Sequence, residues 1–334
     1  MRQIANDVKT GNFNRIYLLY GDEIYLKNSW KNRIIDKLRR PGDTLNYRVF
    51  SGQSIDVAEL ISLADTMPFM AERRLIMVEG SGLFKKSAPD ELVDFIKNVP
   101  DETCLCFVED EVDKRSKLYK AVKSADGCIE ELSQLEESEI KLWAAKKFTK
   151  FNKKVRGTTV QKIIDRVGTD LQSLDSELDK LISYVGDREI VDDEDVEAIC
   201  TVHLNNTVFD LVNATISGEQ KKAMELYYEM IANKEPPLKI LFLIAREFKA
   251  LLETKELMKT TRDRKFIAGK VGRPPFVIGR YEAIVSKFSS GYLSGVINDC
   301  LEMEQGVKTG KISDRLSVEL IIVKYSGAER RTEK

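Results

Sequence analysis

Short apolar runs alternate with helix-forming segments over the first third of the chain. The three clearest runs are rich in β-forming residues and lack polar–apolar alternation; they are residues 16–20, 75–78 and 104–108. Continuous apolar runs of this kind are typical of central strands in a parallel sheet that helices cover on both faces. Weaker strand signals lie at residues 47–50 and 128–129, and helical patterns lie between the strands at residues 23–38, 55–67, 89–97 and 116–123. This order predicts a doubly wound α/β domain over residues 1–137.

Helical periodicity replaces the strand signals in the rest of the chain. Residues 138–205 read as short helices, one of which carries an apolar stripe of Leu171, Leu174, Leu178, Leu181 and Ile182. From residue 206 the expected helices are longer, at residues 208–216, 219–232, 237–258, 276–288, 292–308 and 314–325. We therefore expect two all-α domains, 138–205 and 206–334, after the α/β domain.

The charge and hydropathy of the whole chain limit its partners. A net charge of -1 gives no overall attraction to a polyanion. No apolar stretch reaches the roughly 18 to 20 residues of a membrane span, and the opening MRQIANDVKTGNF lacks the apolar run of a signal peptide. We expect a cytoplasmic protein with no membrane partner.

Few residues suggest catalysis or metal binding. The five cysteines are scattered except for Cys104 and Cys106, which lie two residues apart in the apolar run 104–108 and would therefore share one face of a strand. Reduced thiols packed as small hydrophobes fit this pattern better. The single histidine, His203, lies in a segment that reads as a turn entering a helix. We expect no catalytic residue, no metal site, no cofactor and no small-molecule substrate.

The segment RIYLLYGDEIYLKNS partly matches a phosphate-binding loop, G-x-x-x-x-G-K-[ST]. Gly21 and Lys27 are in register, but Leu26 replaces the second glycine and Asn28 replaces the hydroxyl residue. A leucine obstructs the close approach of the backbone to phosphate, and an amide cannot serve as the hydroxyl ligand of Mg²⁺. These four positions predict a degenerate nucleotide loop.

The acidic residues that would complete an ATPase site are also atypical. The apolar run 104–108 ends in Glu109 and Asp110, in the reverse of the usual Asp-Glu order. Together with the degenerate loop, this predicts a nucleotide-binding architecture without its chemistry. The alternative is a nucleotide-binding ATPase or switch that uses an unusual loop.

Several segments, in order and over nearly the whole chain, resemble one protein family. They are IYLLYGDEIYL, MPFMAERRLIMVE, CFVEDEVDKRSKLYKAV, GTDLQSLDSELDKLISYVGDREIVDDEDVEAI and NTVFDLVNATISGEQKKAMELYYEMI. Together they resemble the delta subunits of bacterial DNA polymerase III, in the clamp-loader branch of the AAA+ superfamily. The last two segments are the more specific to that family.

The resemblance implies a three-part layout. An AAA+-like, clamp-contacting domain without a working nucleotide site would span residues 1–137, a small helical lid 138–205, and a helical collar for oligomerisation 206–334. Implied partners are the sliding clamp (the beta subunit), other clamp-loader subunits through the collar, and primer–template DNA within the assembled complex. The chain itself would not be an enzyme, although its complex would be an ATPase within a polymerase holoenzyme.

The segment IDVAELISLADTMPFMAERR carries the expected partner-binding site. A helix over residues 55–67 would bury a stripe ending at Met67, and Pro68 cannot continue that helix. Phe69 and Met70 follow, at the position where the family carries an apolar pair that plugs into a pocket on the clamp. The resemblance therefore assigns clamp binding to Phe69 and Met70, with Pro68 and Met67 shaping the exit of the helix. The alternative is that both apolar side chains cover the end of a neighbouring strand.

A basic stretch near residue 270 offers a different function. TTRDRKFIAGKVGRPPFVIGR contains six basic residues and one acid, and local positive charge promotes phosphate binding. The candidates for DNA contact are Arg262, Arg264, Lys265 and Arg273. The alternative function is thus a helical DNA-binding module that uses residues 262–280.

Overall fold

The computed structural model describes residues 3–85, 88–201 and 204–327, and His203 lies outside these ranges. The chain divides into two compact units, residues 1–134 and 135–334. Within the described ranges, no helix combines the length and apolar character that crossing a bilayer requires. The further division of the second unit into lid and collar stays a prediction.

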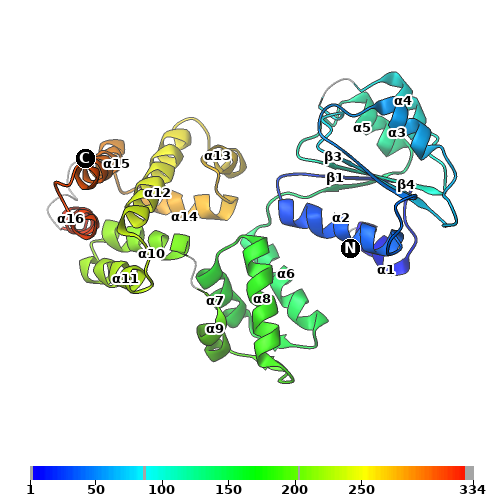
Figure 1. Cartoon of the computed structure of the whole chain (residues 1–334). Helices are drawn as coiled ribbons and strands as arrows, with labels where there is room; N and C mark the ends of the chain where they lie inside the picture. Colours follow the sequence, from blue (N-terminus) through cyan, green and yellow to red (C-terminus); the bar gives the residue numbers. More distant parts are fainter. Residues whose placement is uncertain (1–2, 86–87, 202–203, 328–334) are drawn as a thin grey trace. The chain divides into compact units, whose positions relative to one another are not determined.

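The first unit is built on a five-stranded sheet in which every neighbouring pair is parallel. Its order is β2-β3-β4-β1-β5 (Figure 1). The strands are β1 Ile16–Tyr20, β2 Tyr47–Ser51, β3 Arg74–Glu79, β4 Thr103–Glu109 and β5 Cys128–Glu131. All three continuous apolar runs thus form the central strands β1, β3 and β4, which confirms the predicted α/β fold.

Helices cover both faces of this sheet (Figure 1). On one face lie α1 Gln3–Thr10 and α2 Ile24–Leu38, and on the other α3 Val57–Ala64, α4 Asp90–Ile96 and α5 Lys117–Ser124. Successive residues of a strand point to opposite faces. Accordingly Ile16, Leu18 and Tyr20 join the core cluster with residues of α3, α4 and α5. Tyr17 and Leu19 are equally buried, because α1 and α2 cover the other face.

One predicted helix boundary is wrong in a way that matters for function. The helix expected over residues 55–67 ends at Ala64, so Met67 leaves the buried stripe and becomes exposed. Leu60 and Ala64 are buried as expected. The physical reason is that hydrogen bonds from outside the helix hold the segment after Ala64, among them those from the Arg74 guanidinium to the Leu63 and Met67 carbonyls.

The second unit begins with four helices around a small apolar core. They are α6 Glu137–Lys150, α7 Gly157–Val167, α8 Leu171–Val185 and α9 Asp193–Ile199. Leu171, Leu174, Leu178 and Leu181 of the predicted stripe are buried in it. Two short strands, β6 Lys154–Val155 and β7 Ile190–Val191, pair in parallel. These strands were not predicted, because two residues are too few to carry a periodic signal.

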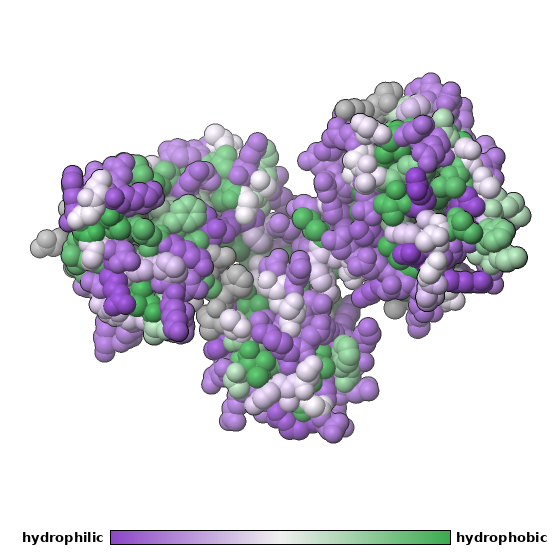
Figure 2. All heavy atoms as spheres, viewed as in Figure 1, coloured by the Kyte–Doolittle hydropathy of each residue, from purple (hydrophilic) through white to green (hydrophobic). Residues whose placement is uncertain are grey.

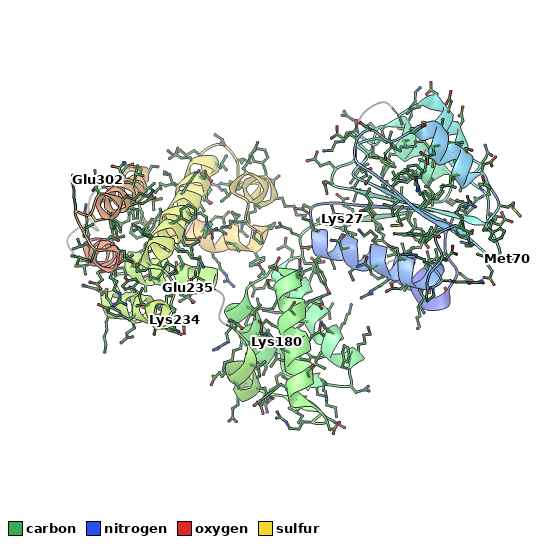
Figure 3. All side chains as sticks on the ribbon, viewed as in Figure 1. Lys27, Met70, Lys180, Lys234, Glu235 and Glu302 are labelled. Atoms are coloured by element: carbon green, nitrogen blue, oxygen red, sulfur yellow. The ribbon has the colours of Figure 1, made fainter. Side chains whose placement is uncertain are left out.

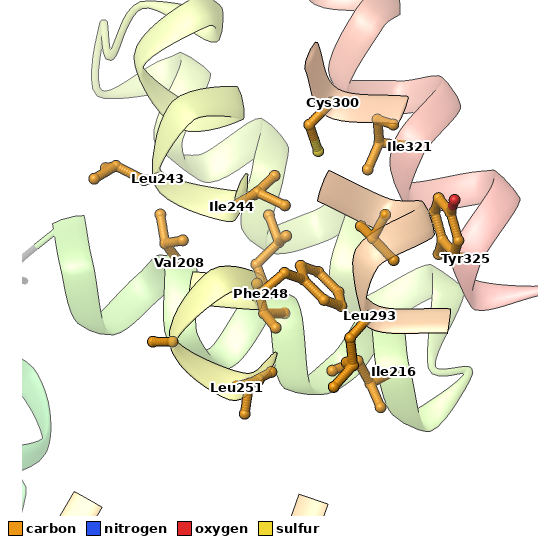
Figure 4. Close-up of a cluster of buried hydrophobic side chains, with 14 of the residues drawn as sticks. Val208, Ile216, Leu243, Ile244, Phe248, Leu251, Leu293, Cys300, Ile321 and Tyr325 are labelled. Carbon is orange, nitrogen blue, oxygen red and sulfur yellow. The ribbon is translucent and has the colours of Figure 1, made fainter. Parts of the chain in front are cut away.

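Seven further helices share a second apolar core (Figure 4). They are α10 Leu204–Ser217, α11 Gln220–Ala232, α12 Pro237–Met258, α13 Arg264–Val271, α14 Pro275–Val285, α15 Ser290–Lys308 and α16 Asp314–Ser326. Phe248 of the long helix α12 lies in this core with Leu293 of α15 and Ile321 of α16. The helix α13 was not predicted, and it lies in the basic stretch.

Candidate functional site

The loop that joins α3 to β3, residues 65–73, exposes several large apolar side chains and is here called the tip loop. Met67, Phe69 and Met70 are 70%, 58% and 82% exposed, and Pro68 is half-buried between them. Apolar surface gathers at the edge of this unit where Met70 is labelled (Figures 2 and 3). Because clustered apolar side chains on a surface mark interaction sites, the tip loop is the first candidate for binding a protein partner.

The parallel sheet separates the tip loop from the degenerate nucleotide loop. The tip loop immediately precedes β3, whereas Gly21 follows β1. In a parallel sheet all strands start at one edge and end at the opposite edge. Lys27 and Met70 accordingly lie at opposite ends of the unit (Figure 3).

Met70 holds a backbone conformation that few residues other than glycine adopt. Its φ of 51° lies in the left-handed region, which costs an L-residue with a side chain roughly 1–2 kcal/mol. Such a conformation persists only where surrounding contacts determine it. The tip loop must therefore be held by other parts of the unit.

Asn46, the residue before β2, makes two hydrogen bonds to the backbone of Phe69, one as acceptor and one as donor. The backbone N–H of Phe69 donates to Asn46 Oδ1 at 2.7 Å, and Asn46 Nδ2 donates to the Phe69 carbonyl at 2.9 Å. Asn46 is only 6% exposed, although it contacts a residue whose side chain is in solvent. The side-chain amide thus replaces a strand partner for Phe69 and leaves the phenyl ring free.

Two arginines hold the ends of the tip loop. Arg74 is buried at the start of β3, and its guanidinium donates to the carbonyls of Leu63 at 2.9 Å and Met67 at 3.1 Å. The Leu63 carbonyl also accepts from the backbone N–H of Thr66 at 3.3 Å, so Arg74 adds a second bond at the end of α3. Arg40 donates to the Met70 carbonyl at 3.1 Å.

Asp43 fixes the orientation of Asn46. Its Oδ2 accepts from Asn46 Nδ2 at 2.9 Å, and its Oδ1 accepts from the backbone N–H groups of Asn46 and Leu45. The side-chain hydrogen bond from Asn46, followed by the backbone bonds, lowers the pKa of Asp43 below its usual value. We call Arg40, Asp43, Asn46 and Arg74 the tip support.

None of the four tip-support residues carries a sequence signal of this role. Their targets are mostly backbone atoms of the tip loop, up to 30 residues away along the chain. Backbone N–H and C=O groups are alike at every residue, so no pattern of side chains reveals such contacts.

The degenerate nucleotide loop is closed by the chain itself. Gly21 has a φ of 129°, and a Cβ there would lie 2.3 Å from the carbonyl oxygen of Leu132. That carbonyl accepts from the backbone N–H of Glu23 at 2.9 Å, and Glu23 caps the start of α2. A phosphate loop needs free N–H groups at this position. Here Leu132 occupies the approach to them.

Lys27 is also committed to an internal partner. It is 4% exposed, and its Nζ donates to Asp110 Oδ1 at 2.5 Å and to the Glu109 carbonyl at 3.3 Å. Leu26 is buried beside it, whereas Asn28 is exposed. A lysine that serves phosphate would need its ammonium group to face the ligand site.

The acidic residue at the end of β4 has a structural partner too. The Glu109 carboxylate accepts from the backbone N–H groups of Ser81 at 3.0 Å and Gly82 at 3.2 Å, and from the Ser81 hydroxyl. It therefore closes the turn after β3 and does not face an open ligand site. The residues present do not fit a nucleotide with its magnesium ion.

The basic stretch is partly neutralised within the second unit. Arg264 pairs with Glu282 at 2.5 Å, Arg273 with Glu247 at 2.6 Å, and Arg280 with Glu137 at 3.1 Å. Arg262 and Lys265 are exposed, and among the described residues neither lies within ion-pair distance of a carboxylate. The four candidates for DNA contact thus divide into two paired and two unpaired residues.

Comparisons of this chain with known proteins point to one family. Residues 17–132 match the family model for "DNA polymerase III, delta subunit", and residues 205–325 match that for "DNA polymerase III delta subunit, C-terminal domain". The chain belongs to the DNA polymerase III delta subunit family. The two models together cover most of the chain, including the tip loop and the helices α10 to α16.

Individual members of the delta family match over similar lengths. DNA polymerase III subunit delta of Bacillus subtilis is 28% identical, covering 99% of this chain and 97% of the relative. A probable DNA polymerase III subunit delta of Aquifex aeolicus is 23% identical, covering 77% of this chain and 75% of the relative. The solved structure of the Bacillus subtilis DNA clamp loader delta protein (YqeN) superposes with a TM-score of 0.86 at 25% identity, covering 97% of this chain and 98% of that one.

The delta family relationship confirms both the resemblance and the fold class, an α/β region with a parallel sheet followed by helices. The chain is a delta-type subunit of a DNA polymerase III clamp loader.

Proposed function

We propose that this delta subunit binds the sliding clamp through the tip loop and favours the open form of the ring. The observation that carries the proposal is an exposed apolar loop on a fixed backbone: Phe69 and Met70 face solvent while buried Asn46 holds the peptide between them. Phe69 is the main anchor, Met70 fits an irregular part of the pocket, and Met67 and Pro68 form its rim.

The exposed fractions support a partner-binding role over the alternative. Side chains that merely covered the end of a strand would be mostly buried, whereas Phe69 and Met70 are 58% and 82% exposed. An aromatic anchor that enters a pocket typically contributes about 2–4 kcal/mol to binding. A fixed loop also lowers the entropy lost on binding.

Ring opening in this proposal is mechanical and makes no covalent bond. A ligand shifts a closed–open equilibrium only by its differential affinity for the two forms. The tip loop would therefore bind the clamp more tightly when the clamp is in its distorted, open conformation.

The rest of the chain would serve the assembly of the complex. Residues 206–334 would join the other loader subunits as a collar, residues 138–205 would be the lid, and primer–template DNA would enter the assembled complex.

ATP chemistry in this proposal belongs to neighbouring subunits. The internal contacts of Gly21, Lys27 and Glu109 support a non-catalytic role for this chain. Movement of the ATP-binding neighbours would then expose or bury the tip loop.

The first test is clamp binding by purified wild type and Phe69→Ala, measured by surface plasmon resonance with a bacterial sliding clamp. We expect the dissociation constant of the variant to rise about 30- to 900-fold, the equivalent of losing one anchor of about 2–4 kcal/mol. Assembly with other loader subunits on a sizing column should not change, because Phe69 lies outside residues 206–334.

Phe242→Ala is the matched control. Phe242 lies on α12 in the second unit and is 61% exposed, so it loses the same side chain from a similarly exposed position. We expect it to bind the clamp as wild type does. Equal clamp affinity for wild type and Phe69→Ala would remove the basis of the proposal.

Ring opening has its own measurement. A clamp loaded on nicked circular DNA leaves it only when the ring opens. We expect wild type to accelerate clamp release and Phe69→Ala to leave the release rate at its basal value.

A further inference from the structure

We propose that Asn46 is a positioning residue that sets the affinity for the clamp by fixing the tip-loop backbone before binding. The inference rests on the proposed function and names the residue that controls the site. Asn46 does not contact the partner in this scheme. It acts through Phe69.

Both donors of the Asn46 side chain and one of its two acceptor sites are used in this role. One N–H of Nδ2 goes to Asp43 Oδ2 and the other to the Phe69 carbonyl, while Oδ1 accepts from the Phe69 N–H. A carboxylate accepts but does not donate, so Asp43 requires the amide nitrogen to face it. Asp43 thereby selects the amide orientation that both Phe69 contacts need.

Three of the tip-support residues donate to or accept from the backbone of the exposed tip residues. Asn46 bonds the N–H and C=O of Phe69, Arg40 the carbonyl of Met70, and Arg74 the carbonyl of Met67. The apolar side chains stay free for a partner. The tip-support residues therefore fix the backbone conformation of the tip loop, while Met67, Phe69 and Met70 supply its apolar side chains.

The left-handed backbone at Met70 makes this support necessary. An unheld methionine would leave the φ of 51° for a more favourable region. Since Phe69 precedes Met70, loss of the two bonds from Phe69 to Asn46 would let the peptide group between Phe69 and Met70 rotate. The fraction of chains with the tip loop ready to bind would then fall.

The expected size of the effect follows from that fraction. The apparent dissociation constant equals the intrinsic constant divided by the competent fraction. If Asn46→Ala reduces that fraction to about a tenth, the dissociation constant rises about tenfold. The loss should come mainly from slower association, because the bound conformation and its contacts are unchanged. Phe69→Ala removes contacts and should chiefly accelerate dissociation.

The experiment uses the full chain and three variants with a bacterial sliding clamp. Asn46→Ala removes all three side-chain bonds. Asn46→Asp has nearly the same size but cannot donate to the Phe69 carbonyl and repels Asp43, so we expect it to bind as weakly as Asn46→Ala. Tyr17→Phe is the control for lost stability, since it deletes a buried hydrogen bond to Asp7 elsewhere in the unit. We expect it to keep wild-type association rates.

Amide hydrogen exchange of residues 65–73 in the free chain supplies a readout that needs no partner. We expect faster exchange of the tip loop in both Asn46 variants and unchanged exchange in Tyr17→Phe. Unchanged exchange, or unchanged clamp affinity in the Asn46 variants while Phe69→Ala binds weakly, would overturn the inference and leave the proposed function intact. Unchanged affinity in Phe69→Ala as well would overturn both.

Discussion

At Asp43, three hydrogen bonds converge on one half-buried carboxylate. Two come from backbone N–H groups and one from the Asn46 amide. All three favour the charged form, and the pKa of Asp43 is lowered, chiefly by the Asn46 side chain. Because the Asn46 side chain contributes most to this shift, the pKa of Asp43 reports whether Asn46 keeps its hydrogen bond to the carboxylate.

This lowered pKa predicts an acid-dependent contribution to stability. A group whose pKa is lower in the folded than in the unfolded state stabilises the fold above its unfolded pKa, and this contribution is lost as pH falls through the folded pKa. We expect wild type to be more stable than Asp43→Ala near about pH 6, and the difference to shrink below about pH 4. Urea unfolding of both proteins across this range measures it. A difference that stays constant with pH would contradict the role of the Asp43 charge.

Among the elements, the junction of β1 with α2 shows how a nucleotide-like loop is closed. β1 pairs with β5, and the chain beyond β5 continues as a partner: Leu132 N–H donates to the Tyr20 carbonyl at 2.6 Å. The Leu132 carbonyl in turn accepts from the backbone N–H of Glu23, and it lies 2.3 Å from where a Cβ at Gly21 would be. Gly21 is therefore required by the packing of the chain on itself, not by a phosphate.

Gly21→Ala should destabilise the first unit more than an open glycine position does. The added Cβ would meet the Leu132 backbone at 2.3 Å, and backbone cannot move aside as a flexible side chain can. Gly52→Ala is the matched control, since Gly52 also has a positive φ, 85°, but has nothing within 4 Å of its added Cβ. We expect Gly52→Ala to cost about 1–2 kcal/mol in unfolding free energy and Gly21→Ala to cost about 1–3 kcal/mol more. Equal losses in urea unfolding would show that Leu132 does not restrict this position.

At the scale of the whole molecule, the two compact units bury separate apolar cores. The tip loop belongs to the first unit, and the exposed control Phe242 to the second. Changes at such separate sites usually have additive effects on stability. Under the proposed function, we therefore expect Phe69→Ala to weaken clamp binding without changing subunit assembly.

The basic stretch of the second unit predicts only a shallow salt dependence for DNA binding by the isolated chain. Each basic residue that contacts a phosphate adds about 0.9 to the slope of log affinity against log salt. Arg264, Arg273 and Arg280 are paired with carboxylates, which leaves three of the six basic residues. We expect a slope of magnitude no more than about 3, instead of about 5. Fluorescence anisotropy with labelled DNA over a range of salt measures it, and a slope of about 5 would favour the DNA-binding module.

Local sequence pattern was sufficient for the elements of the first unit that carry continuous apolar runs. Buried strands on both faces need apolar residues at every position, so β1, β3 and β4 were recognisable without their neighbours. Leu26 and Asn28 also predicted a degenerate nucleotide loop, because they replace residues whose chemistry is specific. The short pair β6–β7 and the helix α13 were missed, since neither has a long periodic pattern.

The sequence by itself determined the α/β class, the helical remainder, and an apolar pair at Phe69 and Met70 after a proline that ends a helix. Only the tertiary structure decided that α3 ends at Ala64, that Met67 is exposed, and that Asn46, Arg74 and Asp43 hold the tip loop. The same is true of the contact of Leu132 over Gly21. The physical reason is that apolar periodicity and proline geometry act within a few residues, whereas these hydrogen bonds join side chains to the backbone of segments that meet only when parallel strands align.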